Sequence, residues 1–157
     1  MVTEMVTLRW PNDLWRPLDP GAVGVEGVEL LVGRAGLGGG YTPLMSVRRT
    51  LLPAGAPLER VADEAALRLA RQTGTAERLR LTTTGTDGPA PGLTQLLAGQ
   101  AEVDGVRYDL RQLDGLLGAV QENGTTAVVV LTAVCTADQL PVVGPEFTAV
   151  LGGMTAD

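Results

Sequence analysis

The sequence predicts a single-domain α+β fold, in which a central antiparallel sheet is flanked by helices. Two observations support this prediction: most segments alternate between apolar and polar residues as strands do, and turn residues rather than helices join them. The order of strand, hairpin, helix, meander and helix packs as a sheet with helices over it. The chain has 157 residues and no internal linker, so we expect residues 1–157 to form one domain around one core.

The first part of the chain predicts a strand followed by a hairpin. Residues 4–10 alternate as a strand does, and residues 14–24, with two prolines and two glycines, form an ordered loop. Residues 25–33 and 44–52 are the next two strands. The glycine-rich segment 36–40 connects them, which indicates a hairpin.

The clearest helix begins at Pro57, where the missing N–H costs nothing, and ends before Gly74. Acidic residues lie early and arginines lie late, as the helix dipole favours, and Glu64 with Arg68 forms a favourable i,i+4 pair. One apolar stripe has helical spacing and comprises Leu58, Val61, Ala62, Ala65 and Leu69.

The next segments predict two strands around a loop. Residues 77–84 alternate as a strand, with Leu79 and Leu81 facing inward, and residues 85–92 have the composition of a loop. Residues 93–103 form a strand with an irregularity at Gly99, or alternatively a short helix.

A hairpin and a central strand follow. Asp104-Gly105 is the strongest hairpin turn in the chain, and the strand that it starts, within 106–121, is broken at Asp114-Gly115. After the turn at 122–124, the apolar, β-branched run 125–135 predicts a strand in the middle of the sheet, covered on both faces.

A closing helix is predicted over residues 138–151. Its most reliable part starts near Pro145, and Phe147, Val150 and Leu151 dock it on the sheet.

The charged composition excludes several function classes. All twelve positive charges are arginine, histidine and lysine are absent, and the net charge is −6, which disfavours nucleic-acid binding. Without histidine there is no Ser-His-Asp triad and no His-liganded metal site, and without lysine no Schiff base. The lone Cys135 cannot form an internal disulfide and is expected to be a buried, inert thiol. We expect a protein that is not an enzyme and has no cofactor or metal.

The beginning of the sequence has neither a basic region followed by an apolar one nor a lipobox cysteine, so no secretion signal is predicted. No stretch of about 18 apolar residues predicts a membrane span. We therefore expect a cytoplasmic location.

Two local patterns have a structural and a chemical interpretation. The glycines at 33, 36, 38, 39 and 40 resemble a phosphate-binding loop, but a strand follows them instead of a helix, which favours a hairpin loop. Asp104, Asp109 and Asp114 could serve acid–base chemistry or bind a cation, yet their places near turns favour turn chemistry.

The adjacent arginines Arg48 and Arg49 must point to opposite faces of their strand. At most one of them is then buried, and a solvated arginine with a carboxylate partner is the expected state.

Large aromatic side chains are scarce in this chain, and Trp10, Trp15 and Tyr41 are three of the five. Two interpretations stay open: they line a pocket or an interaction face, where such residues are enriched, or they fill the edge of the core beneath the loop.

The chain resembles the PsbP-like (Mog-like) superfamily of small proteins over nearly its whole length. The resemblance rests on the strand, Pro, turn and Trp pattern of 8–17, the strand 41–52 that begins Tyr-Thr-Pro, the Pro-x-Glu helix start after Ala56, and the ending 127–135 followed by Gln139. Within the superfamily the chain looks most similar to actinobacterial LpqN-type and DcrB/EagR-type proteins. Leu44 departs from the family pattern, which often has Asn there, and a lipoprotein signal is missing.

This resemblance implies a central antiparallel sheet flanked by helices, and it implies protein binding rather than catalysis. EagR-type members are dimeric chaperones that hold hydrophobic helices of secreted effectors in a concave groove. PsbP-like members are accessory subunits of a photosynthetic complex, and Mog-like members bind a small GTPase.

The first functional hypothesis is a non-catalytic protein-binding module, such as an adaptor or chaperone for a secreted or membrane-associated partner. The expected partner is an apolar or amphipathic helix of a secreted effector, with no nucleic acid and no direct membrane insertion. Exposed apolar and aromatic residues near the first loop and hairpin would bind it, namely Trp10, Trp15, Tyr41, Leu44 and Met45.

The alternative hypothesis is a small-molecule-binding protein or an enzyme that uses an Asp/Arg cluster on the 104–111 strand. Arg107, Asp109 and Arg111 would share one face there, near Asp104. A third hypothesis, compatible with the first, is a homodimer formed through sheet edges that lack lysine.

Overall fold

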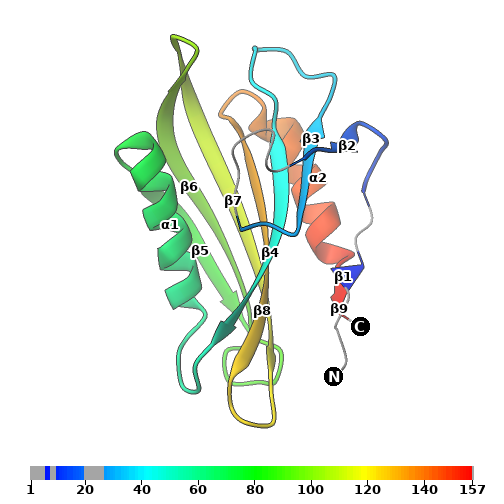
Figure 1. The fold of residues 1–157 in the computed structure, drawn as a ribbon, viewed down its shortest axis with the longest axis vertical. Helices are drawn as coiled ribbons and strands as arrows, with labels where there is room; N and C mark the ends of the chain where they lie inside the picture. The colour runs from blue at the N-terminus through cyan, green and yellow to red at the C-terminus, as the bar shows by residue number, and fades with distance from the viewer. Residues whose placement is uncertain (1–5, 8–9, 20–26, 157) are drawn as a thin grey trace.

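A seven-stranded antiparallel sheet organises the molecule, in a computed structural model that describes residues 6–7, 10–19 and 27–156 (Figure 1). The spatial order of its strands is β2-β3-β4-β8-β7-β6-β5. Their bounds are β2 Trp15–Pro17, β3 Leu30–Arg34, β4 Leu44–Leu52, β5 Glu77–Thr84, β6 Gly92–Val103, β7 Val106–Val120 and β8 Thr126–Thr136. A separate pair joins β1 (Val6–Thr7) to β9 (Thr155–Ala156). The predicted α+β fold is confirmed.

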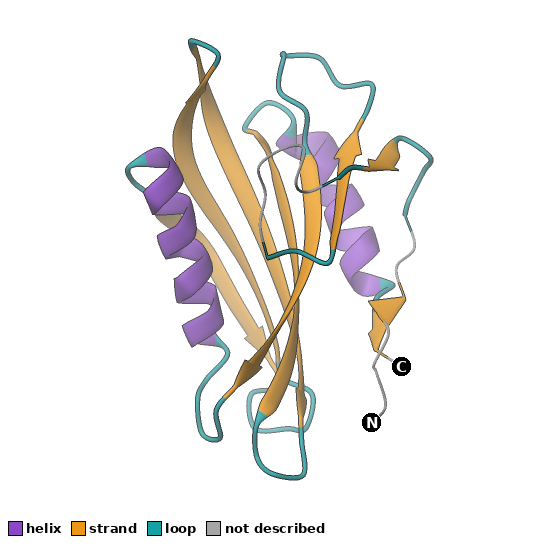
Figure 2. Ribbon diagram, viewed as in Figure 1, coloured by secondary structure: helices purple, strands orange, loops and turns teal. Residues whose placement is uncertain are grey.

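The two helices of the described residues, α1 (Glu59–Thr73) and α2 (Leu140–Gly152), cover opposite faces of this sheet (Figure 2). Each face therefore has its own apolar cluster. The first cluster is packed by α2, and its helix residues are Val143, Phe147 and Val150; the second is packed by α1. The apolar strand β8 supplies Leu131 to one cluster and Val130 to the other, so it is the central strand covered on both faces that the sequence predicts.

Helix α1 follows its sequence signals closely. Gly74 ends it with φ +86°, and its N–H donates to the Ala70 carbonyl at 2.7 Å. The predicted apolar stripe is buried against the sheet. The expected ion pair between Glu64 and Arg68 is absent: in the described part of the chain, neither side chain forms a salt bridge. An exposed pair of this kind gains only a few tenths of a kcal/mol, about what ordering two long side chains costs.

The first part of the chain differs most from prediction. Of the described residues of the expected strand 4–10, Val6–Thr7 is a strand and Trp10 is not; residues 4, 5, 8 and 9 lie outside the described residues. The predicted loop 14–24 contains β2, which pairs with β3 through Trp15 opposite Arg34. Strand β3 begins at Leu30, after Gly27 with φ +74°, a backbone angle outside the strand region; residues 25 and 26 of the predicted strand lie outside the described residues. The predicted hairpin of β3 and β4 is confirmed.

The meander β5–β6–β7 shows two corrections. The pairing of β5 with β6 shifts register between Arg78 and Arg80, so Leu79 is 46% exposed, contrary to its expected inward position, while Leu81 packs on the α1 cluster. Strand β7 runs unbroken through Asp114, which is fully buried. The expected turn there is absent because Asp114 finds its hydrogen-bond donors inside the sheet.

Strand β6 is regular through Gly99, where the sequence predicted an irregularity. A Cβ at Gly99 would lie 3.0 Å from the Thr73 hydroxyl oxygen and 3.2 Å from the Thr75 carbonyl oxygen. The glycine therefore serves the close approach of the segment after α1, and not a bulge.

Helix α2 begins at Leu140, with a proline in its first turn and Pro145 inside it. Neither helix that the structure describes has the length and apolarity to cross a lipid bilayer.

Candidate functional site

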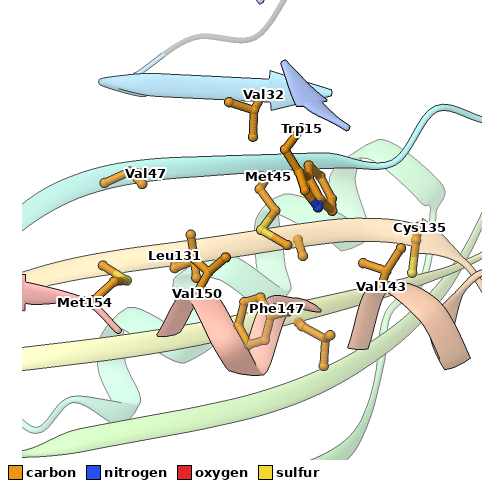
Figure 3. Packing of buried hydrophobic residues seen from close by; sticks show 12 residues of the cluster. Trp15, Val32, Met45, Val47, Leu131, Cys135, Val143, Phe147, Val150 and Met154 are labelled. Carbon is orange, nitrogen blue, oxygen red and sulfur yellow. The ribbon is translucent and has the colours of Figure 1, made fainter. Parts of the chain in front are cut away.

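The five residues predicted to bind a partner do not form one surface, and they are less exposed than expected: Trp10, Trp15 and Met45 lie on the α2 side of the sheet, and Tyr41 and Leu44 line a cavity on the α1 side. Trp15 and Met45 belong to the α2-facing core, with side chains 4% and 0% exposed (Figure 3). Trp10 is half-buried and stacks on Trp15 with ring centroids 6.2 Å apart. The expectation of exposure is therefore wrong for Trp15 and Met45, because β2 joins the sheet and turns Trp15 inward.

Tyr41 and Leu44 are half-buried and line a small cavity on the other face of the sheet. The Tyr41 ring meets Tyr108 edge-on at a centroid distance of 5.4 Å. Burial raises the pKa of the Tyr41 phenol, with a smaller contribution from Cys135, so this residue is neutral at pH 7. Whether Trp10, Tyr41 and Leu44 touch a partner stays a prediction.

A buried ion pair fixes Trp15 and α2 together. The Glu146 carboxylate accepts hydrogen bonds from Arg34 Nε at 2.8 Å, Trp15 Nε1 at 2.9 Å and Asn12 Nδ2 at 3.2 Å. Burial raises the pKa of Glu146, but these three donors and the guanidinium charge outweigh it, so the net pKa is lowered. The arrangement holds the first loop on α2, and it confirms the core-edge role that the sequence left open for Trp15.

The best candidate for a docking surface lies along α2 and is called here the α2 groove. It holds about 400 Å³ between α2 and the strands β5, β6 and β7. Its apolar wall and floor are formed by Leu96, Leu113, Leu140, Phe147 and Leu151, and its polar rim by Arg80, Thr94 and Thr148.

The α2 groove exists because α2 covers only part of its face. The helix packs on β7 and β8. Over the parts of the chain that the structure describes, no helix lies on this face of β5 and β6, whose α1 face is packed instead. Leu96 of β6 is accordingly only half-buried, although its neighbours Gln95 and Leu97 are fully buried on the other face. The uncovered strip is apolar at its centre and cationic at Arg80.

The structure brings together only part of the Asp/Arg cluster predicted on the 104–111 strand: Asp109 and Arg111 line an open pocket of about 540 Å³, and Asp104 and Arg107 do not line it. Asp104 lies in the hairpin turn with φ +52°, which is turn chemistry. Asp109 and Arg111 form an ion pair at 2.6 Å on the surface, with the Asp109 side chain 55% exposed. Arg107 is exposed and, among described residues, is not part of that pair.

The glycine-rich loop and Cys135 have structural roles. The Gln139 side-chain amide donates to the carbonyls of Gly38 and Tyr41, at 3.1 and 2.7 Å, so the loop is fastened to the start of α2. Cys135 is a buried free thiol, as expected, and burial raises its pKa to about 11 against a smaller opposing effect of Arg111.

Comparison with known proteins reveals similarity only at the level of structure. No family model matches the chain, and no curated protein matches its sequence. The chain is similar to the crystal structure of LpqN involved in cell envelope biogenesis of Mycobacterium tuberculosis, with a TM-score of 0.62 and 16% identity, over 98% of this chain and 84% of that one. The chain has an LpqN-like fold.

Sequence reasoning missed a polar network inside this LpqN-like fold. The buried carboxylate of Asp114 accepts hydrogen bonds from Gln95 Nε2 at 2.8 Å, Thr132 Oγ1 at 2.7 Å and Gln112 Nε2 at 3.1 Å. Gln95 also donates to the Ala62 carbonyl of α1, which ties the helix to the sheet. The available signal was the placement of Gln95, Gln112 and Asp114 on strands at positions that otherwise face the core.

Proposed function

We propose that the chain is a non-catalytic protein-binding module that holds an apolar or amphipathic helix of another protein in the α2 groove. The observation that carries this proposal is the strip of sheet beside α2, which has an apolar floor and no helix of the described chain over it. A helix of a partner would lie about 8–10 Å from the axis of α2, the usual separation of packed helices, and would bury Leu96 and Leu151.

The charge at the rim indicates how such a helix is oriented. Arg80 stands at the β5 side of the groove and has no carboxylate partner among the described residues. A cation stabilises the negative end of a helix dipole. We expect the partner helix to place its C-terminal turn or an acidic residue next to Arg80.

Further parts of the proposal rest on resemblance. Membership of the PsbP-like superfamily, kinship with EagR-type chaperones and an actinobacterial origin are proposed from the sequence resemblance and from the LpqN-like fold. LpqN is described as involved in cell envelope biogenesis, which agrees with a secreted or membrane-associated partner. A homodimer and a cytoplasmic location stay predictions from the sequence.

Site-specific photo-crosslinking in the protein's native cells tests the proposal. A photoreactive phenylalanine derivative replaces Thr148, which is exposed and lines the groove; the matched control replaces Ala149, its exposed neighbour outside the groove. We expect position 148 to capture one partner through an apolar helical segment, identified by mass spectrometry of the crosslinked peptide. Equal capture from both positions, or capture of a polar segment only, would overturn the proposal.

A further inference from the structure

A second cavity lies on the opposite face of the sheet, between α1 and the strands β4, β7 and β8. It holds about 180 Å³, which is small compared with pockets for drug-sized ligands. Apolar side chains of Leu44, Leu110 and Val134 form part of its wall. Two arginines, Arg48 from β4 and Arg68 from α1, also line it.

Arg48 enters this cavity because of strand alternation. Its neighbour Val47 packs in the α2-facing core, so Arg48 points to the α1 face, and Arg49 points back and pairs with Glu29 at 3.1 Å. The Nε atom of Arg48 is fully buried and has no hydrogen-bond partner in the structure described. Leaving a buried donor unpaired is costly, so proteins supply nearly all such groups with a hydrogen-bond acceptor, and a bound molecule is one source of it.

The charges around Arg48 leave an excess of positive charge. Burial lowers the pKa of Arg48, the nearby Arg68 lowers it further, and Asp114 opposes both. The Asp114 oxygens are occupied by Gln95, Gln112 and Thr132. Over the described residues, Arg68 has no salt bridge of its own.

We propose that this cavity binds a small organic monoanion, whose carboxylate lies between Arg48 and Arg68 and whose short apolar body contacts Leu44 and Leu110. Two guanidinium groups against one buried carboxylate leave one positive charge to balance, which favours a carboxylate over a doubly charged phosphate. The fork of donors on arginine matches a carboxylate, and Nε is one of those donors. This site is independent of the α2 groove and lies on the other side of the sheet.

Nuclear magnetic resonance of the full chain tests the site directly, because the Nε–H group of Arg48 gives its own signal in a ¹⁵N-labelled protein. The probes are hexanoate, the neutral hexan-1-ol and inorganic phosphate. Arg48→Met assigns the signal by its loss. We expect hexanoate to shift this signal in a saturable way, and hexan-1-ol to leave it in place.

Variants of α1 separate binding from general charge effects. Arg68→Gln keeps Arg48 and should weaken hexanoate binding about tenfold, as loss of one charge-assisted contact does. Arg60→Gln, at an exposed arginine of the same helix outside the cavity, should leave it unchanged. The proposal is overturned if hexanoate gives no saturable shift, if hexan-1-ol acts equally, if phosphate binds more tightly, or if both variants weaken binding alike.

Discussion

At the scale of single residues, one buried carboxylate and one largely buried carboxylate determine how the polar side chains around them are arranged. Asp114 lies within the sheet under α1, and Glu146 lies on α2 against the first loop. Both accept three different donor side chains. A carboxylate whose hydrogen bonds are all made adds little to the net free energy of folding. Substituting it is costly, however, because its donor side chains are then left buried without an acceptor.

Asp114→Asn should destabilise the protein by about 2–4 kcal/mol, because an amide NH₂ would then face donor groups. The measurement is the free energy of unfolding in urea. Asp109→Asn is the control, because Asp109 is exposed and its surface ion pair should contribute less than about 1 kcal/mol. Equal losses in the two variants would contradict the role assigned to the buried network.

Glu146 gives the stability a defined pH dependence. Its folded-state pKa is lowered, so its contribution is fully present above its unfolded pKa of about 4.3 and is lost as the pH falls through the folded value. Glu146→Gln should cost about 1–3 kcal/mol at pH 7. The difference in unfolding free energy between this variant and the wild type should become smaller below about pH 4.3. Urea titrations at neutral and acidic pH measure it, and a constant difference would contradict the assignment.

At the scale of elements, the close packing of α2 on the sheet depends on a glycine of strand β7. A Cβ on Gly115 of β7 would lie 2.6 Å from Leu151 Cδ1 on α2, so a side chain at this position would force the Leu151 side chain to move. The same approach sets one wall of the α2 groove, to which Leu151 belongs.

Gly115→Ala should destabilise the protein by about 1–3 kcal/mol through overpacking against α2. Gly152→Ala is the matched control, because that position has no heavy atom within 4 Å of the added methyl group and lies at the end of α2. Thermal unfolding followed by circular dichroism compares the two variants. A cost for Gly152→Ala as large as that for Gly115→Ala would show that the contact with Leu151 is not the cause.

Elements with strong local signals were predictable from the sequence, and those set by distant partners were not. Strands 44–52 and 77–84 match their predicted ranges, because alternation and flanking turn residues are local. The three-residue β2 contains a proline and is a strand only because β3 pairs with it. Asp114 looked like a turn residue because its donors come from other strands.

The candidate site shows the same division. The aromatic cluster of Trp10 and Trp15 was identifiable as a feature, but its burial depends on Glu146, more than 130 positions away. The α2 groove and the pairing of Arg48 with Arg68 depend on which strands each helix covers, and no pattern in a single sequence specifies that.

At the scale of the whole molecule, Cys135 reports on whether the α2 side of the protein opens. Its thiol is 1% exposed within the cluster that includes Val143 of α2. A thiol reagent can therefore reach it only after α2 lifts or the protein unfolds.

Labelling of Cys135 by a disulfide reagent at pH 8 should be at least about a thousandfold slower in the native protein than in urea-unfolded protein. Gly115→Ala should accelerate labelling, because the added methyl group would press against Leu151 and weaken the packing of α2 on the sheet. The absorbance of the released thiolate gives the rate. Native labelling as fast as that of the unfolded chain would mean that α2 does not protect this face.

The pairing of β1 with β9 has a mechanical consequence. Val6 lies opposite Ala156 and Thr7 opposite Thr155. The residue of β1 nearest the N-terminus is therefore paired with the residue of β9 nearest the C-terminus, at the same end of the strand pair. A force that pulls the two ends of the chain apart breaks the hydrogen bonds of these residue pairs one pair at a time. In a parallel pair pulled lengthwise, all the bonds would bear the force together. Tension transmitted through flanking segments would therefore peel β1 from β9 before it reached the seven-stranded sheet.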